Sequence, residues 1–320
     1  MLTVLEDRFR LAQTFTISRG SKTEAQVLTV RIARDGATAW GECVPYARYG
    51  ETLESVRRQI QGLPDGILRP DLQALLPAGA ARNAVDCALW DLEAKAAGKR
   101  IWDLTGAPPP RPILTAYTLS LAAPETMQQA AARNAHRPIL KVKLGSPDDL
   151  ARLHAVRTGA PGSALLVDAN EGWTAETYLA LLPHLRAAGV ALIEQPFPAG
   201  QDAALANLPR PIPVCADESC HDRSSLPALV GKYDVVNLKL DKTGGLTEGV
   251  LTLDLARAMG FGVMVGCMVG SSLAMAPAVL LAQGADWTDL DGPLLLAEDR
   301  PHPLRYDDAG VHPPDANLWG

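Results

Sequence analysis

The sequence has 320 residues, of which 47% are hydrophobic and 21% charged, so it can bury a large core and is not a disordered chain. Its formal net charge of -6 argues against nucleic acid or an anionic membrane as the main partner, since both attract basic surfaces. The five cysteines form no CxxC pair and are odd in number, which argues against a disulfide framework or structural zinc. We therefore expect a globular protein with a small-molecule substrate.

Neither the start of the chain nor its longest uncharged stretch predicts a membrane or secreted protein. Residues 1–10 contain four charged side chains and no apolar run before a cleavage site, so no signal peptide is predicted and a cytoplasmic location is expected. Residues 258–285 carry no charge, but glycines and Pro277 divide them into strand, loop and helix, which favours buried core over a membrane span.

Residues 1–107 are predicted to form an α+β capping domain. The runs "EAQVLTVRIAR" (24–34) and "ATAWGECV" (37–44) flank Asp35-Gly36, a strong hairpin signal, and "LTVLEDRFRL" (2–11) supplies a third antiparallel strand. In "ARNAVDCALWDLEAKAAGK" (81–99) the apolar residues recur at helical spacing, and Gly98 ends the helix as a C-cap.

After the proline-rich boundary "GAPPPRP" (106–112), residues 108–292 are predicted to form a (β/α)7β TIM-like barrel. Residues 293–320 are expected to return to the capping domain. A leucine-rich solenoid would need LxxLxL repeats, which are absent, and an open doubly wound sheet would need a glycine fingerprint after a strand, whereas "GFGVMVG" precedes one. The eight aliphatic runs, separated by amphipathic stretches, are "ILTAYTL", "ILKVKLG", "ALLVDAN", "VALIEQP", "IPVCADES", "DVVNLKLD", "FGVMVGC" and "DWTDLDG".

Charged residues follow the predicted strands at their C-terminal ends, where barrel enzymes place catalytic groups. Three carboxylates from consecutive strands, Asp168, Glu194 and Asp217, would repel one another unless a hard divalent cation lay between them. Their oxygen ligands favour one Mg²⁺ over zinc. Each carboxylate alone could instead be a helix N-cap. The six residues are Lys143, Asp168, Glu194, Asp217, Lys239 and Asp289.

Lys141 and Lys143 share one face of the strand "ILKVKLG", because side chains on a strand alternate. That face could be an ordinary solvated surface. If it points into the barrel, two ammonium groups roughly 6.6 Å apart repel by about 2.5 kcal/mol at an effective dielectric near 20. This repulsion would lower the pKa of one lysine toward about 8.5 and suit it to act as a base.

Lys239 is expected to lie across the barrel from this strand. A site with a metal between two opposed lysines could remove a proton from one face of a carbon and return one to the other face. A carbon next to a carboxylate needs such help, because its deprotonation creates an enediolate with extra negative charge. Mg²⁺ and an ammonium group such as that of Lys141 would stabilise that charge.

The chain resembles the enolase superfamily, whose members pair a lysine base with Mg²⁺. Within it the muconate lactonising subgroup, and in particular the dipeptide epimerases, are most similar. The resemblance covers essentially the whole chain and includes "GECVPYARYGET", "ARNAVDCALWDLEAK", "KVK", "VDANEGW", "IEQP", "ADES", "NLKLDKTGG", "MVGSS" and "DLDGP".

The resemblance implies a role for each matching residue. Lys143 and Lys239 would be the acid/base lysines, and Lys141 would help to hold the substrate carboxylate. Asp289 and Asp291 would meet the free α-ammonium group of a dipeptide, although Asp291-Gly292 is also an ordinary turn pair. The metal ligands would be Asp168, Glu194 and Asp217.

Further positions follow from the same resemblance. Arg19 would lie in a mobile loop that closes over the site and receives a glutamate side-chain carboxylate. Asn170 and Glu218 would orient lysine or ligand groups from behind. Ser271 would offer a backbone N–H to the substrate, or would only cap a helix.

The implied function is Mg²⁺-dependent 1,1-proton transfer that epimerises the C-terminal residue of a dipeptide, L-Ala-L-Glu to L-Ala-D-Glu, in murein peptide metabolism. N-acylamino acid racemase, o-succinylbenzoate synthase and cycloisomerase are alternatives with the same core, and a catalytically silent metal-binding barrel or a phosphosugar enzyme are others. The oligomeric state stays open, with a homo-oligomer as one alternative.

Overall fold

The capping domain is built on a three-stranded antiparallel sheet, in a computed structural model that describes residues 1–320. Strands β1 (Leu2–Ile17), β2 (Gly20–Arg34) and β3 (Ala37–Cys43) are neighbours in that order. The predicted hairpin is confirmed, since Asp35 and Gly36 both have positive φ, at 51° and 81°, as a tight hairpin turn requires.

Four helices complete this part of the chain, and α3 packs directly on β3. A Cβ on Gly41 would lie 2.1 Å from the carbonyl oxygen of Ala84, so only glycine allows this close approach. The helix is buried on nearly all sides and ends, as predicted, at Gly98 in the left-handed conformation. The helices are α1 (Leu53–Gln61), α2 (Arg69–Leu75), α3 (Ala80–Ala97) and α4 (Ile101–Thr105), preceded by the short turn η1 (Ala47–Tyr49).

The second sheet has eight parallel strands in sequence order, which confirms the predicted barrel. The barrel closes through a hydrogen bond from the Ala116 N–H to the Thr288 carbonyl oxygen at 2.9 Å. Ala116 directly precedes the first strand, and Thr288 lies in the last strand. The strands are β4 (Tyr117–Leu119), β5 (Ile139–Lys143), β6 (Ala164–Asp168), β7 (Val190–Glu194), β8 (Val214–Ala216), β9 (Val235–Leu238), β10 (Gly262–Gly266) and β11 (Trp287–Asp289).

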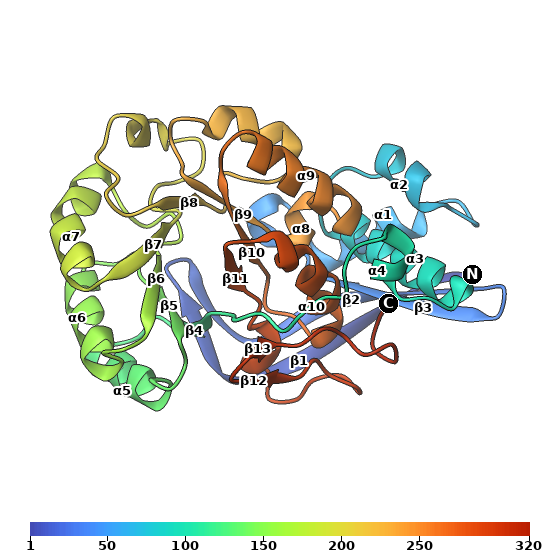
Figure 1. Ribbon diagram of the computed structural model, residues 1–320, viewed down its shortest axis with the longest axis horizontal. Coiled ribbons are helices and arrows are strands. Elements are labelled where there is room, and N and C mark those ends of the chain that lie inside the picture. Colours follow the sequence, from blue (N-terminus) through green and yellow to red (C-terminus); the bar gives the residue numbers. More distant parts are fainter.

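Helices cover the outside of the barrel except after β7 and β8, where 3-10 turns replace them. Figure 1 shows α5 to α7 along the outer side of β4–β7, with β3 and α3 at the opposite end of the molecule. The crossovers contain α5 (Pro124–Arg133), α6 (Asp149–Gly159), α7 (Ala175–Ala187), η2 (Ala203–Ala206), η3 (Arg223–Leu229), α8 (Leu240–Thr243), α9 (Leu246–Ala258), α10 (Ser272–Leu281) and η4 (Ala282–Gly284).

The register of the barrel decides which side chains point inward. Lys141 pairs with Leu166, and Leu166 pairs with Leu192. Both leucines belong to a small buried cluster that is separate from the main core around the helices. Leu140 and Val142, which alternate with the lysine, belong to the main core instead. The Lys141 and Lys143 face therefore points into the barrel.

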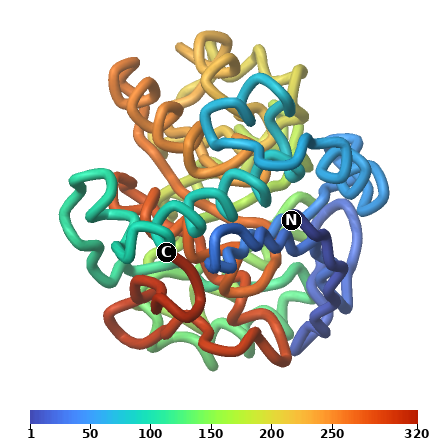
Figure 2. The backbone as a smooth tube through the Cα atoms, turned by 90° about the vertical axis from the view of Figure 1, so that its right-hand side faces the viewer, coloured from blue at the N-terminus to red at the C-terminus, as the bar shows by residue number.

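The last residues of the chain pack against the capping helix α3. The indole N–H of Trp319, which is fully buried, donates to the Cys87 carbonyl oxygen at 2.9 Å, and the Gly320 N–H donates to Asp91 at 2.7 Å. Both chain ends lie at this end of the molecule (Figures 1 and 2). The domain limits 107/108 and 292/293 remain our proposal. Before the tail lie η5 (Gly292–Leu295), β12 (Tyr306–Asp307) and β13 (Gly310–Val311).

None of the helices combines the length and the apolar character that crossing a membrane requires.

Candidate active site

The C-terminal ends of the barrel strands bring the six predicted charged residues together. Lys143, Asp168 and Glu194 are paired in register as the last residues of three adjacent strands. Asp217 and Lys239 each follow the last residue of their strand directly, and Asp289 ends β11. All six are buried, although charged side chains are almost never buried without partners. The arrangement therefore has to be explained by their mutual contacts.

Lys141 lies among three carboxylates. Its Nζ is 2.7 Å from Asp289 Oδ2, 2.7 Å from Glu194 Oε2 and 3.2 Å from Asp168 Oδ2. Lys143 Nζ, on the same strand face, donates to Asp168 Oδ2 at 2.6 Å. One side of the site is thus a buried network of two ammonium groups and three carboxylates.

The facing side of the site has its own lysine pair. Lys239 Nζ donates to Asp217 Oδ2 at 2.7 Å, and Lys242 Nζ donates to Asp217 Oδ1 at 2.6 Å. Asn237 Nδ2 donates to Glu194 Oε1 at 2.9 Å and links the two sides. Sequence reasoning missed Lys242 and Asn237. The alternation of Val235, Asn237 and Lys239 could have indicated the asparagine, whereas a lysine in a short helix carries no signal of burial.

The three carboxylates suit a hard cation by their chemistry. All their donors are oxygens, and the Asn170 N–H orients Asp168 by donating to its Oδ1 at 2.9 Å. Glu194 Oε2 is buried without a hydrogen-bond partner, because its 2.7 Å contact with Lys141 lacks hydrogen-bond geometry. As the side chains stand, lysines separate the carboxylates and no three acidic, His or Cys groups form a ready ligand set. The all-oxygen donor set, with the buried Glu194 Oε2 that accepts no hydrogen bond, fits Mg²⁺.

Burial and neighbouring charges shift the pKa values of this network in opposite directions. Burial raises the pKa of Glu194 to about 7, helped by the negative charge of Asp168. Burial alone would also raise the pKa of Asp168. The positive charges of Lys143 and Lys141 outweigh this effect and hold the pKa of Asp168 well below its usual range. For Lys141, burial lowers the pKa, yet Asp289 and the other carboxylates raise it well above the ordinary value. The expected repulsion therefore does not leave Lys141 with a low pKa.

Asp289 and Asp291 lie beside this network. Asp289 Oδ2 contacts Lys141, and its Oδ1 is buried without a partner. Asp291 Oδ2 accepts a 2.6 Å hydrogen bond from the Thr118 N–H on the first barrel strand, and only 3% of the residue is exposed. Burial and the charge of Asp289 raise the pKa of Asp291 to about 6. Asp291 is thus a buried residue that joins the last strand to the first and not an exposed turn residue.

Arg19, in the turn between β1 and β2, reaches over the barrel rim. Its guanidinium group donates to Glu218 Oε1 at 2.7 Å and to the Asn170 carbonyl oxygen at 2.9 Å. Glu218 is almost fully buried, and its other oxygen has no partner. The structure thus brings Arg19, Asn170 and Glu218 together. Glu218 pairs with Arg19 here, and its role in orienting a lysine or a ligand group stays a prediction.

Ser271 is fully buried and both its donors are engaged by another residue, which does not support its expected contact with substrate. Its hydroxyl and its N–H both donate to the carboxylate of Glu42, and its hydroxyl oxygen also accepts from the Leu273 N–H and from Arg300. Glu42 comes from β3 of the cap, so Ser271 caps α10 and joins the two parts of the molecule. The plainer alternative, helix capping, is the one that the structure supports.

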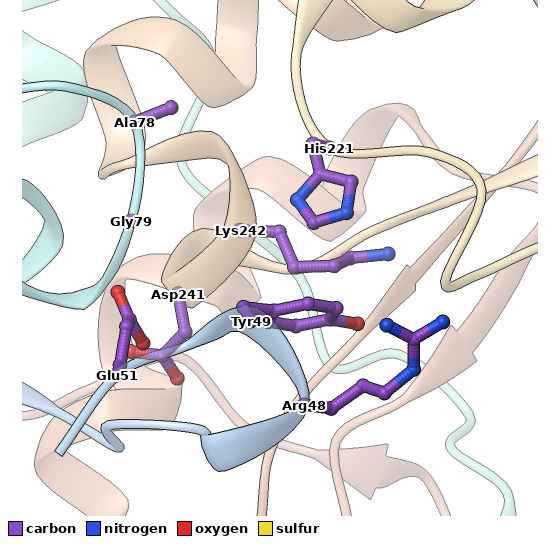
Figure 3. A pocket seen from close by; sticks show the side chains of 8 residues that line it. All are labelled: Arg48, Tyr49, Glu51, Ala78, Gly79, His221, Asp241 and Lys242. Carbon is purple, nitrogen blue, oxygen red and sulfur yellow. The ribbon is translucent and has the colours of Figure 1, made fainter. Parts of the chain in front are cut away.

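A pocket of about 380 Å³ lies between the cap and the barrel and is lined in part by Lys242, which contacts Asp217. Figure 3 shows Tyr49, His221 and Lys242 gathered near its centre, with Glu51 and Asp241 to one side. The rings of Tyr49 and His221 meet edge to face, with centroids 4.6 Å apart. The pocket borders the charged network through Lys242 and does not contain the opposed lysines.

Comparisons with known proteins match both parts of the chain. Residues 1–106 match the family described as the mandelate racemase / muconate lactonizing enzyme N-terminal domain, and residues 125–317 match the enolase C-terminal domain-like family.

Several relatives are similar over nearly their full length. The L-Ala-D/L-Glu epimerase of Escherichia coli is 46% identical over 97% of this chain and 98% of that protein. An N-acetyl-D-glutamate racemase from a Pseudoalteromonas species is 47% identical over 92% of this chain and 95% of that protein. A crystal structure of an enolase family member from Agrobacterium tumefaciens with homology to dipeptide epimerases, with sodium and L-Ala-L-Glu bound, is 51% identical with a TM-score of 0.98, covering 100% of this chain and 99% of that one.

Proposed function

We propose that this chain is an epimerase that converts L-Ala-L-Glu to L-Ala-D-Glu. It belongs to the mandelate racemase / muconate lactonizing enzyme family of the enolase superfamily. The observation that carries the proposal is the pair of buried lysines, Lys143 and Lys239, on strands half a barrel apart. They flank a network of carboxylates whose oxygen donors suit a cation.

The two lysines would move protons on opposite faces of one carbon. One lysine, in its neutral form, takes the proton from the α-carbon of the second residue of the dipeptide, which leaves an enediolate. The other lysine, protonated, returns a proton to the opposite face and inverts the configuration. After the turnover the first lysine is protonated and the second is neutral. In the reverse reaction the two lysines exchange roles.

The charge of the enediolate needs stabilisation that the substrate does not need. The ammonium group of Lys141 provides part of it, because its contacts hold it buried and positively charged beside the site. A Mg²⁺ ion held by Asp168, Glu194 and Asp217 would supply further electrostatic stabilisation of the substrate carboxylate. Asn170 positions Asp168 through its backbone N–H.

Substrate choice would depend on groups at both ends of the dipeptide. Asp289, which has a free buried oxygen, would accept the α-ammonium group together with Asp291. Arg19 would pair with the side-chain carboxylate of the glutamate residue in place of Glu218.

N-acylamino acid racemisation is the second candidate, favoured by the 47% identity with the N-acetyl-D-glutamate racemase. The two buried aspartates argue for the dipeptide, because an N-acyl group has no ammonium to pair with them.

Isotope exchange in D₂O tests the proposal directly. With L-Ala-L-Glu and Mg²⁺, NMR should detect deuterium at the glutamate α-carbon and formation of the D-epimer, and EDTA should abolish both until Mg²⁺ is restored. Absence of exchange would refute the proposal. A higher kcat/KM for N-acetyl-glutamate than for the dipeptide would favour the second candidate.

We also propose that this activity serves the breakdown of murein peptides in the cytoplasm. The cysteines support the location alone: all five are free and four are buried, as is usual in a reducing compartment. Fractionation of cells with an antibody against the protein would test the location.

A further inference from the structure

Glu171, three residues after Asp168, accepts hydrogen bonds from three separate loops. Arg48 makes a bidentate pair with it, from Nε to Oε2 at 2.9 Å and from an Nη to Oε1 at 2.7 Å. Arg19 donates to Oε2 at 3.1 Å, and the Ala199 N–H donates to Oε1 at 2.8 Å. The side chain is only 8% exposed although it carries a charge. Both carboxylate oxygens of Glu171 are thus engaged by more than one donor.

The backbone around Glu171 is held in a costly conformation. Asn170 and Glu171 have φ values of 44° and 68°, in the left-handed region that favours glycine. The turn is tied to the residue that follows β7 by the Glu171 N–H, which donates to the Gln195 carbonyl oxygen at 2.9 Å. A Cβ at Gly172 would lie 2.6 Å from the Cα of Gly145, so the next residue is packed against another loop. The barrel therefore fixes where the carboxylate of Glu171 stands.

The two arginines belong to two different segments of the cap. Arg19 lies in the β1–β2 turn, and Arg48 lies in η1 and lines the pocket between the cap and the barrel. Their guanidinium groups would repel each other when held together, and one carboxylate between them removes that repulsion. The bidentate geometry of Arg48 also fixes direction, which a single contact would not do.

We propose that Glu171 is a positioning residue that anchors both capping segments, the β1–β2 turn and η1, over the barrel rim. The inference rests on the proposed function, in which Arg19 meets the acidic side chain of the substrate, and it adds the residue that holds Arg19 and Arg48 in place together. Glu171 itself touches neither the substrate nor the reacting carbon.

Hydrogen–deuterium exchange of the substrate-free protein tests the anchor without any assay of activity. In Glu171→Gln, which keeps the size of the side chain and removes its charge, peptides covering 14–22 and 46–52 should both exchange about tenfold faster. In Arg48→Gln only the 46–52 peptide should change by that amount. Glu176→Gln, on the exposed first turn of α7, is the matched control and should exchange like the wild type.

Kinetics with L-Ala-L-Glu provide the second measurement. If substrate binding has to close released segments, Glu171→Gln should raise KM about tenfold while kcat falls less than threefold. Unchanged exchange in both peptides would overturn the proposal, and so would a lowered KM, because Glu171 would then only compete with substrate for Arg19. If the wild type does not epimerise dipeptides, the proposed function fails, whereas the exchange experiment still decides the role of Glu171.

Discussion

At the scale of single residues, the site depends on lysines that the fold turns inward. Alternation along "ILKVKLG" places Lys141 and Lys143 on one face, but the register with Leu166 decides that this face is the interior. Once inside, the two lysines have different partners. Lys141 contacts three carboxylates, whereas Lys143 contacts Asp168 alone. The difference fits a lysine that stabilises charge beside one that moves a proton.

Removing one acid/base lysine should separate proton exchange from epimerisation. Lys143→Ala and Lys239→Ala should each lose epimerisation by at least about a thousandfold, because one face of the carbon then has no acid or base. Each variant should still exchange the α-proton of one epimer, and the two variants should retain different epimers. NMR of L-Ala-L-Glu and L-Ala-D-Glu in D₂O measures this. Lys99→Ala, at an exposed position, is the control. Retained epimerisation in either variant would contradict the two-base arrangement.

Asp241 should make stability depend on pH. Burial, with the charges of Glu51 and Glu42, raises its pKa from 3.8 to about 7, although it accepts hydrogen bonds from the Val44 N–H and Asn83. The folded state therefore holds a proton that the unfolded chain releases above about pH 4, and stability falls as pH rises from about 4 to about 7.

Asp241→Asn cannot ionise and keeps the acceptor oxygen. Its free energy of unfolding should exceed that of the wild type by up to about 4 kcal/mol at pH 8, and by much less at pH 5. Urea titration at both pH values measures the difference, with Asp254→Asn at an exposed position as control. An equal difference at the two pH values would exclude this titration.

At the scale of elements, buried polar contacts hold the cap to the barrel. The N-terminus of α10 is joined to β3 through Ser271 and Glu42, and the first turn after β9 is joined to α3 through Arg82, which donates to the Thr243 carbonyl oxygen at 2.7 Å. Such contacts fix the cap relative to the strand ends. They explain why residues that resemble substrate-binding groups in sequence can have a structural role.

Ser271→Ala should lower stability and leave substrate binding unchanged. The substitution removes one donor from the buried Glu42 carboxylate and the cap of α10, which costs about 1–3 kcal/mol. Chemical denaturation measures the loss, and steady-state kinetics should give KM within twofold of the wild type. A tenfold rise in KM with unchanged stability would restore the original expectation that Ser271 contacts substrate.

At the scale of the whole molecule, the C-terminal residues pack against the cap, which is formed by the first part of the chain. Because these residues contact α3, the barrel is connected to the cap both before its first strand and after its last. Arg100 strengthens this connection by donating to the Pro314 carbonyl oxygen at 2.8 Å. The tail is therefore held to the cap by buried side-chain and backbone contacts.

Trp319→Ala should destabilise the protein strongly, because it leaves a large cavity against α3 and removes the indole hydrogen bond to the Cys87 carbonyl oxygen. We expect a loss of about 3–5 kcal/mol in the free energy of unfolding, measured by chemical denaturation. Trp319→Phe should cost less, since most of the buried ring volume remains. A loss below about 1 kcal/mol for the alanine variant would mean that the tail is not packed as described.

Much of the fold followed from local patterns in the sequence. All eight barrel strands, the hairpin at Asp35-Gly36 and the helix that ends at Gly98 were predictable because period-2 and period-3.6 patterns and turn residues act over a few neighbours. The positions of the strand-end charges followed from the same patterns. These features, with the family resemblance, were enough to predict the reaction class.

Only the tertiary structure decided which side chains meet. Lys242 and Glu171 gave no signal, because a buried lysine or glutamate looks in sequence like a surface residue, whereas only the alternation along its strand pointed to Asn237. Asn170 and Glu218, which accept hydrogen bonds from Arg19, lie more than 100 residues away along the chain, and Glu42 is as distant from its partner Ser271. Contacts at that separation are set by how the barrel closes and where the cap docks. The sequence by itself thus determined the elements and the chemical groups, and the packing between distant segments determined the roles of those groups.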